Sequence, residues 1–193
     1  GQTAEPNLPE WNRFIIWRGG KPGNFELKLE YRISAMGNSA VQYRSVELPD
    51  TRWVLRGYQL DIDGVQWGDR FYEKYSKPRG LTVRRVTGQN FEERGRTFLA
   101  FPGQLSYAGT GQTQRVLAVL GEGGELARAL SDDWNRAHVI ARGGELIHIV
   151  NDRVMSIVID DDANRRTEGL LGMQVHHGPP MKVEFRNIRL KAL

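Results

Sequence analysis

The strongest constraint on the fold is a strict alternation of side chains in residues 25–33. Every second residue from Phe25 to Ile33 is apolar, and every residue between them is charged. Successive side chains of a β-strand point to opposite faces, so this period of two predicts a strand with one face in a core and one in water. An amphipathic helix would show a period near 3.6 residues instead.

The same period recurs along the chain, but there the polar faces carry amides, carboxylates and an arginine. In residues 57–63, Tyr58, Leu60 and Ile62 alternate with Gln59, Asp61 and Asp63, which is typical of a half-buried strand. In residues 38–45, the polar side chains of one parity are Asn38, Gln42 and Arg44. These polar faces can be a solvated surface or the floor of a binding site.

The end of the chain reads as two strands joined at a Gly-Pro-Pro turn. Apolar residues in 171–175 alternate with Gly172, Gln174 and His176. Pro179 and Pro180 follow, and because proline cannot donate to a strand ladder they mark the corner. The polar face of this pair again carries an amide, together with an imidazole.

Further strands are predicted at residues 14–17, 91–100, 136–142, 145–150 and 154–159, with short turns between them. One short helix is predicted at residues 125–130. Many strands with almost no helix predict an all-β fold, an antiparallel β-sandwich forming a single domain over residues 1–193. Residues 64–90 lack a sustained period, and we interpret them as an insertion loop containing one short hairpin.

Composition excludes several classes of protein. The chain has no cysteine, which rules out disulfides, thiol catalysis and thiolate metal sites. Its net charge of +4 is scattered, so a nucleic-acid partner is not expected. No apolar run approaches the roughly 20 residues of a membrane span. The chain begins without Met and without a charged-then-apolar leader, and we expect a trimmed N-terminus.

Six segments, in order, resemble the 3-keto-disaccharide hydrolase domain family. These segments are residues 37–45 (GNSAVQYRS), 57–63 (GYQLDID), 91–96 (FEERGR), 133–135 (DWN), 172–176 (GMQVH) and 178–188 (GPPMKVEFRNI). Each is weak alone, but the ordered set is specific, and it covers the chain from about residue 14 to its end. The resemblance implies a jelly roll of the concanavalin A-like lectin/glucanase type.

The chain departs from the family pattern in four places. Residues 64–90 replace a short connection and contain four aromatic residues, namely Trp67, Phe71, Tyr72 and Tyr75. Ala40 stands where the family has glycine, and Asn151-Asp152 replaces an Asn-Gly turn. The start of the domain is shortened. The insertion is the departure that bears on substrate size.

The resemblance implies cleavage of glycosides already oxidised to a ketone at C3 of the sugar. The carbonyl acidifies the C2 proton, and loss of that proton lets the group at C1 leave by elimination, after which water adds back. Such a site needs a base near C2, a donor at the C3 oxygen and an acid at the leaving group. The paired carboxylates of ordinary glycoside hydrolysis are not required.

We favour His176 as the base, because an unperturbed imidazole titrates near neutral pH, and Glu93 is the rival. Arg44 and Arg94 are candidates for stabilising the enolate oxygen. Candidates for binding substrate are Asn38, Gln42, Tyr58, Gln59, Asp61 and Gln174. Alternatively, His176 is a solvated surface residue and Arg44 forms a surface ion pair with Asp61 of little energetic consequence.

A cofactor is not required by the sequence. Asp61, Glu93 and His176 nevertheless form a set that suits a divalent cation such as calcium or manganese.

An enzyme acting on 3-keto-glycosides is the leading hypothesis, with a carbohydrate substrate as its partner. The second is a non-catalytic, lectin-like carbohydrate-binding module, because a fold does not determine a function. The third is an interaction domain of a larger extracellular protein. The resemblance further implies a bacterial protein in the periplasm or outside the cell.

Overall fold

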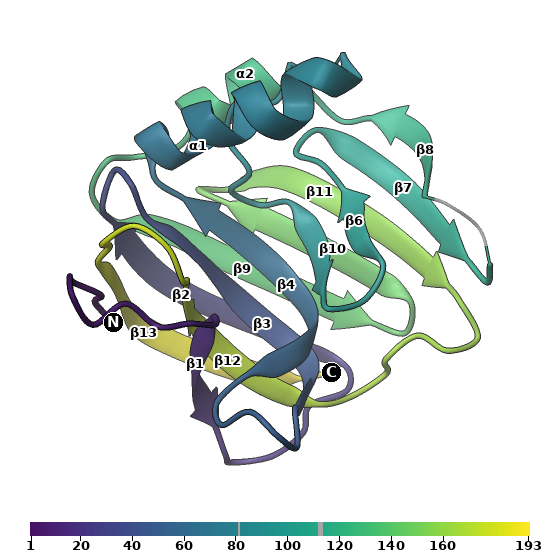
Figure 1. Cartoon of the computed structure of the whole chain (residues 1–193). Helices are drawn as coiled ribbons and strands as arrows, with labels where there is room; N and C mark the ends of the chain where they lie inside the picture. Colours follow the sequence, from purple (N-terminus) through teal and green to yellow (C-terminus); the bar gives the residue numbers. More distant parts are fainter. Residues whose placement is uncertain (81, 112–113) are drawn as a thin grey trace.

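The computed structural model describes residues 1–80, 82–111 and 114–193, and these form a sandwich of two β-sheets packed face to face (Figure 1). The strand order of one sheet is β1-β12-β3-β4-β5-β6. Its strands are β1 (Arg13–Trp17), β12 (Leu170–Val175), β3 (Asn38–Glu47), β4 (Leu55–Asp63), β5 (Asn90–Glu93) and β6 (Thr97–Ala100). Every pair of neighbours in this sheet is antiparallel.

The second sheet has seven strands in the order β13-β2-β9-β10-β11-β7-β8. They are β13 (Val183–Ala192), β2 (Phe25–Ile33), β9 (Asn135–Arg142), β10 (Glu145–Val150), β11 (Arg153–Asp161), β7 (Gln104–Gly109) and β8 (Arg115–Val119). β7 runs parallel to β11, and the other neighbours are antiparallel. The predicted all-β sandwich is therefore confirmed.

The core lies between the sheets and is built by the alternation seen in the sequence. Phe25, Leu27, Leu29 and Tyr31 of β2 are each at most 3% exposed and face the inner side chains of β3 and β4. Burying a side chain of this size contributes about 1.5–3 kcal/mol each. The outer face of the six-stranded sheet is left free to carry polar groups.

The insertion was predicted wrongly as a loop with a hairpin, because most of it is helical. α1 (Val65–Phe71) runs on into a π-helical turn (Tyr72–Ser76) and a 3-10 turn (Lys77–Arg79). The predicted helix near residue 125 is α2 (Gly123–Arg128). Both helical segments lie at the same end of the sandwich, at the top of Figure 1.

Asp63 attaches this insertion to the sheet. Its buried carboxylate accepts hydrogen bonds from the backbone N–H groups of Val86 and Thr87, at 3.2 and 2.9 Å, and from the Thr87 hydroxyl. The Arg85 guanidinium adds an ion pair at 3.2 Å. Gly64, where the helix begins, lies so close to the backbone of Ser34 and Ala35 that a Cβ there would clash with their carbonyl oxygens. The helical segment is therefore held against the end of β4.

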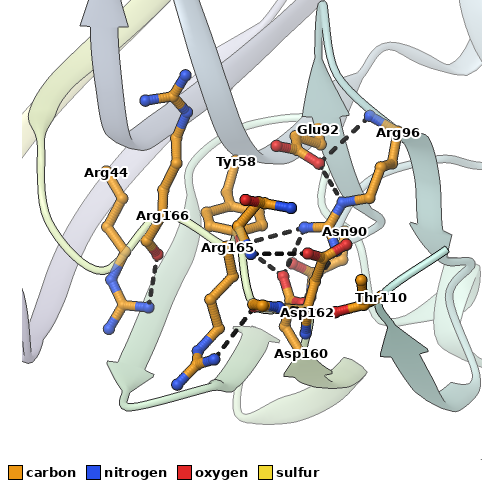
Figure 2. A network of polar contacts seen from close by, with 12 residues as sticks. Arg44, Tyr58, Asn90, Glu92, Arg96, Thr110, Asp160, Asp162, Arg165 and Arg166 are labelled. Atoms are coloured by element: carbon orange, nitrogen blue, oxygen red, sulfur yellow. Dashed lines mark hydrogen bonds and ion pairs between the residues drawn. The ribbon is translucent and has the colours of Figure 1, made fainter.

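A polar network crosses the interior between the sheets (Figure 2). Arg96 donates to Glu92 at 2.5 Å and to both carboxylate oxygens of Asp160, at 2.9 and 2.5 Å. The Tyr58 hydroxyl donates to the same Asp160. Because Tyr58 and Glu92 belong to one sheet and Asp160 to the other, the network joins the two layers.

No helix among the described residues is both long and apolar enough to cross a membrane.

Candidate functional site

A cavity of about 330 Å³ opens on the outer face of the six-stranded sheet, beneath the helical segment. Its lining brings together six of the residues singled out in the sequence, which are Asn38, Gln59, Asp61, Glu93, Gln174 and His176. Side chains that the sequence did not single out as site residues complete the lining, which are Asn12, Trp67, Phe71, Tyr75, Val86, Gln89, Phe91, Thr97 and Phe98.

Strand register explains why the polar side chains converge. Asp61 lies opposite Ala40 and Gln59 lies opposite Gln42, so both β4 side chains point away from the core. On the other side of β3, Gln174 of β12 points to the same face. The small side chain of Ala40 leaves room above the floor between them. The alternation of the three strands thus produces one polar floor.

Asp61 is the most deeply buried charge in this floor. Its two carboxylate oxygens accept hydrogen bonds from the side-chain amides of Gln59 and Gln89, each at 2.6 Å. Burial raises the pKa of Asp61 well above its usual range, and the nearby Glu93 and Asp63 raise it further, although the two amide hydrogen bonds oppose this. Asp61 is therefore a rigidly positioned hydrogen-bonding group that ionises reluctantly.

Replacing Asp61 with asparagine is expected to stabilise the protein by about 1 kcal/mol near neutral pH. The folded-state pKa of Asp61 is raised, so its ionisation favours the unfolded chain, and stability is lost as the pH rises through the folded-state pKa. Gln59 and Gln89 can turn their free amide oxygens toward the new side chain. Melting temperatures at about pH 5 and pH 8 check this: the gain should be larger at the higher pH. A melting temperature that falls by the same amount at both pH values would contradict this prediction.

His176 stands just beyond the end of β12, at the wall of the cavity. Its ring packs edge-on against the indole of Trp67, with 5.1 Å between ring centroids. Burial, followed by the effect of His177, lowers the pKa of His176 to about 4. Nδ1 contacts the carbonyl oxygen of His177. A tautomer that carries the proton on Nδ1 would donate to this oxygen and leave the lone pair on Nε2.

Glu93 and Asn12 also line the cavity. Burial raises the pKa of Glu93, while Arg94 and a hydrogen bond from Asn12 lower it, and the net direction is upward. The carbonyl oxygen of the Asn12 side chain accepts from the backbone N–H of His177 at 3.0 Å. Asn12 therefore connects the Glu93 carboxylate to the backbone that carries His176.

Several polar atoms of residues that line the cavity are buried and have no hydrogen-bond partner among the described residues. They are the amide oxygens of Gln59 and Gln89, both amide atoms of Gln174, and the indole N–H of Trp67. A buried polar group without a partner costs roughly 1–3 kcal/mol, so such groups are normally matched by water or a ligand. Amides that can both donate and accept suit a ligand rich in hydroxyl groups.

Three aromatic side chains of the insertion form the roof. Trp67, Phe71 and Tyr75 are spaced by four residues, which places them on one face of the helical segment, and all three border the cavity. This spacing was the signal that would have predicted the helix. Asn12 and Gln89, by contrast, lie in irregular segments, so nothing in the sequence pattern marks them.

Arg44 does not reach the cavity, contrary to the sequence-based role as an enolate stabiliser. It occupies a β-bulge with φ of 46°, which reverses the parity expected from Gln42. Its guanidinium is buried and donates to the backbone carbonyls of Gly23, Gly143 and Arg166, at 3.0, 2.8 and 3.3 Å. Arg44 thus joins loops of both sheets, and it does not pair with Asp61.

Three further candidates also lie outside the lining. Tyr58 points inward and stacks on Tyr43, as the parity of its strand requires. Gln42 faces the correct side but is fully buried and donates to the carbonyl of Gly57 at 3.3 Å. Arg94, in the turn after β5, places its guanidinium 5.3 Å from the ring centroid of Trp11. Arg94 acts on the site only through its charge next to Glu93.

The cavity does not present a ready metal centre. Among the described residues, no three His, Asp or Glu side chains come together with the spacing that a metal ion needs. Asp61, the best placed of the three candidates, already uses both oxygens to accept from amides.

A different hollow, of about 260 Å³, lies on the outer face of the seven-stranded sheet. Most of its charged groups are already matched: Arg136 pairs with Asp152, and Glu30 accepts from Arg186 and Asn187. The free polar atoms of the first cavity have no counterpart there among the described residues, so the first cavity is the better candidate site.

Comparisons with solved structures show the same architecture. A candidate glycosyl hydrolase from Parabacteroides distasonis ATCC 8503 matches with a TM-score of 0.59 and 16% identity, covering 100% of this chain and 90% of that one. The carbohydrate-binding module CBM66 from Bacillus subtilis gives 0.54 and 14%, covering 95% and 84%. A Bacillus subtilis protein of unknown function with a galectin-like fold gives 0.55 and 15%, covering 90% and 74%. At these identities the likeness establishes the fold.

No curated protein matches the chain significantly. A family profile does match, over residues 7–191, which is nearly the whole chain, and its description agrees with the family suggested by the ordered motifs. The chain belongs to the 3-keto-disaccharide hydrolase family, described as the 3-keto-alpha-glucoside-1,2-lyase-like domain.

Proposed function

We propose that the cavity binds the sugar of a 3-keto-glycoside and cleaves its glycosidic bond by elimination across C1 and C2. The base takes the C2 proton, the electrons of that bond form the C1–C2 double bond, and the group at C1 leaves with its oxygen. Water then adds to the double bond. The ketone is already present in the substrate, so no oxidant or reductant is consumed.

His176 serves as the base in this proposal. In this proposal Nδ1 carries the proton and Nε2 carries the lone pair that takes the C2 proton. A pKa of about 4 keeps the imidazole neutral at ordinary pH. Packing against Trp67 limits the orientations of the ring. The lowered pKa makes the imidazole a weaker base than one that titrates near the working pH, so the step depends on the activation of the C2 proton by the neighbouring carbonyl.

Negative charge develops on the C3 oxygen and must be stabilised by hydrogen-bond donors. Arg44 does not reach the cavity, so other side chains have to supply these donors. The indole N–H of Trp67 and the amide N–H of Gln174 are buried in the lining and have no partner among the described residues. In this proposal the two side chains turn their N–H groups toward the C3 oxygen when the substrate binds. A donor held against a developing oxyanion is worth about 10²–10³ in rate. Glu93, with its raised pKa, is the group that protonates the leaving oxygen.

The observation that carries the proposal is the meeting of an ionisable pair, His176 and Glu93, with free amide groups in one cavity of a chain of this family. Amides and aromatics alone would suffice for a binding module. A neutral imidazole and a reluctantly ionised carboxyl in one cavity provide the base and the acid that elimination needs.

The test is release of the aglycone from a chromogenic 3-keto-glucoside and from the corresponding plain glucoside, with and without EDTA. We expect release from the keto substrate alone. Loss of that release with EDTA would show that a divalent cation takes part. Binding of both sugars by calorimetry without any release would contradict the enzymatic proposal and favour a lectin-like module.

Replacing Asn12 with alanine is expected to lower kcat/KM on the keto substrate by about tenfold. The change removes a hydrogen bond that favours the ionised form of Glu93, so the pKa of Glu93 should rise and the corresponding limb of the pH–rate profile should move upward. Asn164→Ala, in an exposed turn, is the control. A lower rate with an unshifted pH profile would show that Asn12 is only structural.

A further inference from the structure

A second, larger cavity adjoins the candidate site. It has a volume of about 550 Å³, and Thr97 and Phe98 line both cavities. The described lining of the second cavity includes Leu99, Phe101 and Ala108, with Arg79 and Arg96 at its charged side. The floor of the first cavity is amides and a carboxyl, whereas the second is walled mainly by aromatic and aliphatic groups.

Phe98 is the centre of an aromatic cluster that continues from one cavity to the other. It stacks on Phe101 with 5.1 Å between ring centroids and 21° between planes, and it meets Phe91 edge-on at 5.2 Å. Phe71 and Tyr75 of the helical roof approach the same ring at 6.2 and 6.5 Å. Flat rings arranged in this way favour a flat ligand that stacks on them.

Arg79 supplies a positive charge beside this cluster. Its guanidinium lies 5.7 Å from the ring centroid of Phe98, and it donates to the backbone carbonyl of Tyr75 at 2.7 Å. No acidic side chain among the described residues forms an ion pair with it. The second guanidinium, that of Arg96, is already bound by Glu92 and Asp160.

From these features we infer that the second cavity is an aglycone subsite for aryl groups, so that the preferred substrates are aryl 3-keto-glycosides. This inference rests on the proposed function. The first cavity, at about 330 Å³, is at the small end of ligand pockets and suits one sugar ring. The group at C1 must therefore lie outside it, and the aromatic cavity adjoins it. Elimination develops negative charge on the aglycone oxygen. A phenol, with a pKa of about 10, carries this charge better than an alcohol does, and the Arg79 cation stabilises it until Glu93 protonates the oxygen.

The experiment compares phenyl and methyl 3-keto-glucosides as substrates of the wild type and of two variants that alter only the second cavity. Phe101→Leu removes the ring stacked on Phe98, and Arg79→Gln removes an exposed charge that no acidic side chain among the described residues pairs with. We expect kcat/KM on the phenyl substrate to fall about tenfold in Phe101→Leu and about fivefold in Arg79→Gln, with less than a twofold change on the methyl substrate. Arg128→Gln, on the exposed face of α2, is the matched control. An equal change in kcat/KM on the phenyl and methyl substrates, or no change on either, would contradict the assignment of this cavity as an aryl subsite.

Calorimetry with the unoxidised phenyl and methyl glucosides judges the subsite independently of turnover. Tighter binding of the phenyl glucoside, weakened in both variants, supports the subsite even if neither keto substrate is cleaved, in which case the proposed function alone fails. Equal affinity for the two glucosides overturns the subsite even if the elimination chemistry is found. The two proposals can thus fail separately.

Discussion

Replacing His176 with asparagine is expected to lower kcat/KM for a 3-keto-glucoside by about a thousandfold, which is the usual contribution of a general base. Asparagine keeps a polar side chain of similar size but cannot accept the C2 proton. Because the pKa of His176 is lowered to about 4, the acidic limb of the wild-type pH–rate profile should lie near that value, while the other limb should follow the raised pKa of Glu93. Steady-state kinetics across the acidic range check both statements.

The neighbouring histidine provides the matched control. His177 stacks on His176 with 4.7 Å between ring centroids, but its side chain is exposed and does not line the cavity. His177→Asn should leave kcat/KM within about twofold of the wild type. Equal losses in the two variants, or an active His176→Asn protein, would remove His176 from the mechanism and leave Glu93 as the base.

The largest expected effect on stability comes from replacing Arg96 with methionine. The change should lower the free energy of unfolding by about 3–5 kcal/mol, because it leaves the carboxylates of Asp160 and Glu92 buried without their cation. The Asp160 side chain is 1% exposed and that of Glu92 is 9% exposed, so water cannot replace the guanidinium easily. Figure 2 shows how the three side chains converge between the sheets.

Urea unfolding of Arg96→Met measures this effect. The control is Arg128→Met, because the side chain of Arg128 is 74% exposed. Burial alone would raise the pKa of Asp160, but hydrogen bonds from Arg96 and Tyr58 outweigh it and hold the pKa below its ordinary value. Its stabilisation is therefore present above the unfolded-state pKa and is lost as the pH falls through the folded-state pKa. The acid-induced loss should be smaller in Arg96→Met. Similar unfolding midpoints for the two variants would contradict the structural role of the network.

The layers of the fold could be predicted because alternation alone decides which side of a strand is buried. The pattern from Phe25 to Ile33 gave β2 its bounds and its inner face, and the same rule placed Gln59, Asp61 and Gln174 on one outer surface. The same alternation indicates that the side chain of Tyr58 points into the core. The structure confirms this orientation, so Tyr58 was assigned wrongly to the substrate site.

Features that depend on an irregular backbone could not be predicted in this way. The bulge at Arg44 shifts the register of β3 by one residue and sends that side chain into the interior. The helix over the cavity was not predicted. Its apolar stripe, Trp67, Phe71 and Tyr75, lies among glycine and charged residues, and the segment was interpreted as a loop because it lacks the alternation of a strand. Asn12 joins the site through long-range pairing of β1 with β12, which no local pattern encodes.

The most direct test of the mechanism is to run the reaction in D₂O and examine C2 of the released 3-keto-sugar by NMR. Elimination followed by hydration predicts deuterium at C2 in the product of the wild-type protein, and little product of any kind from His176→Asn. Authentic 3-keto-glucose incubated under the same conditions corrects for spontaneous exchange. A wild-type product that retains its original C2 proton, together with an unchanged rate when the substrate carries deuterium at C2, would show that the bond at C1 is broken without proton abstraction at C2, and would contradict the mechanism.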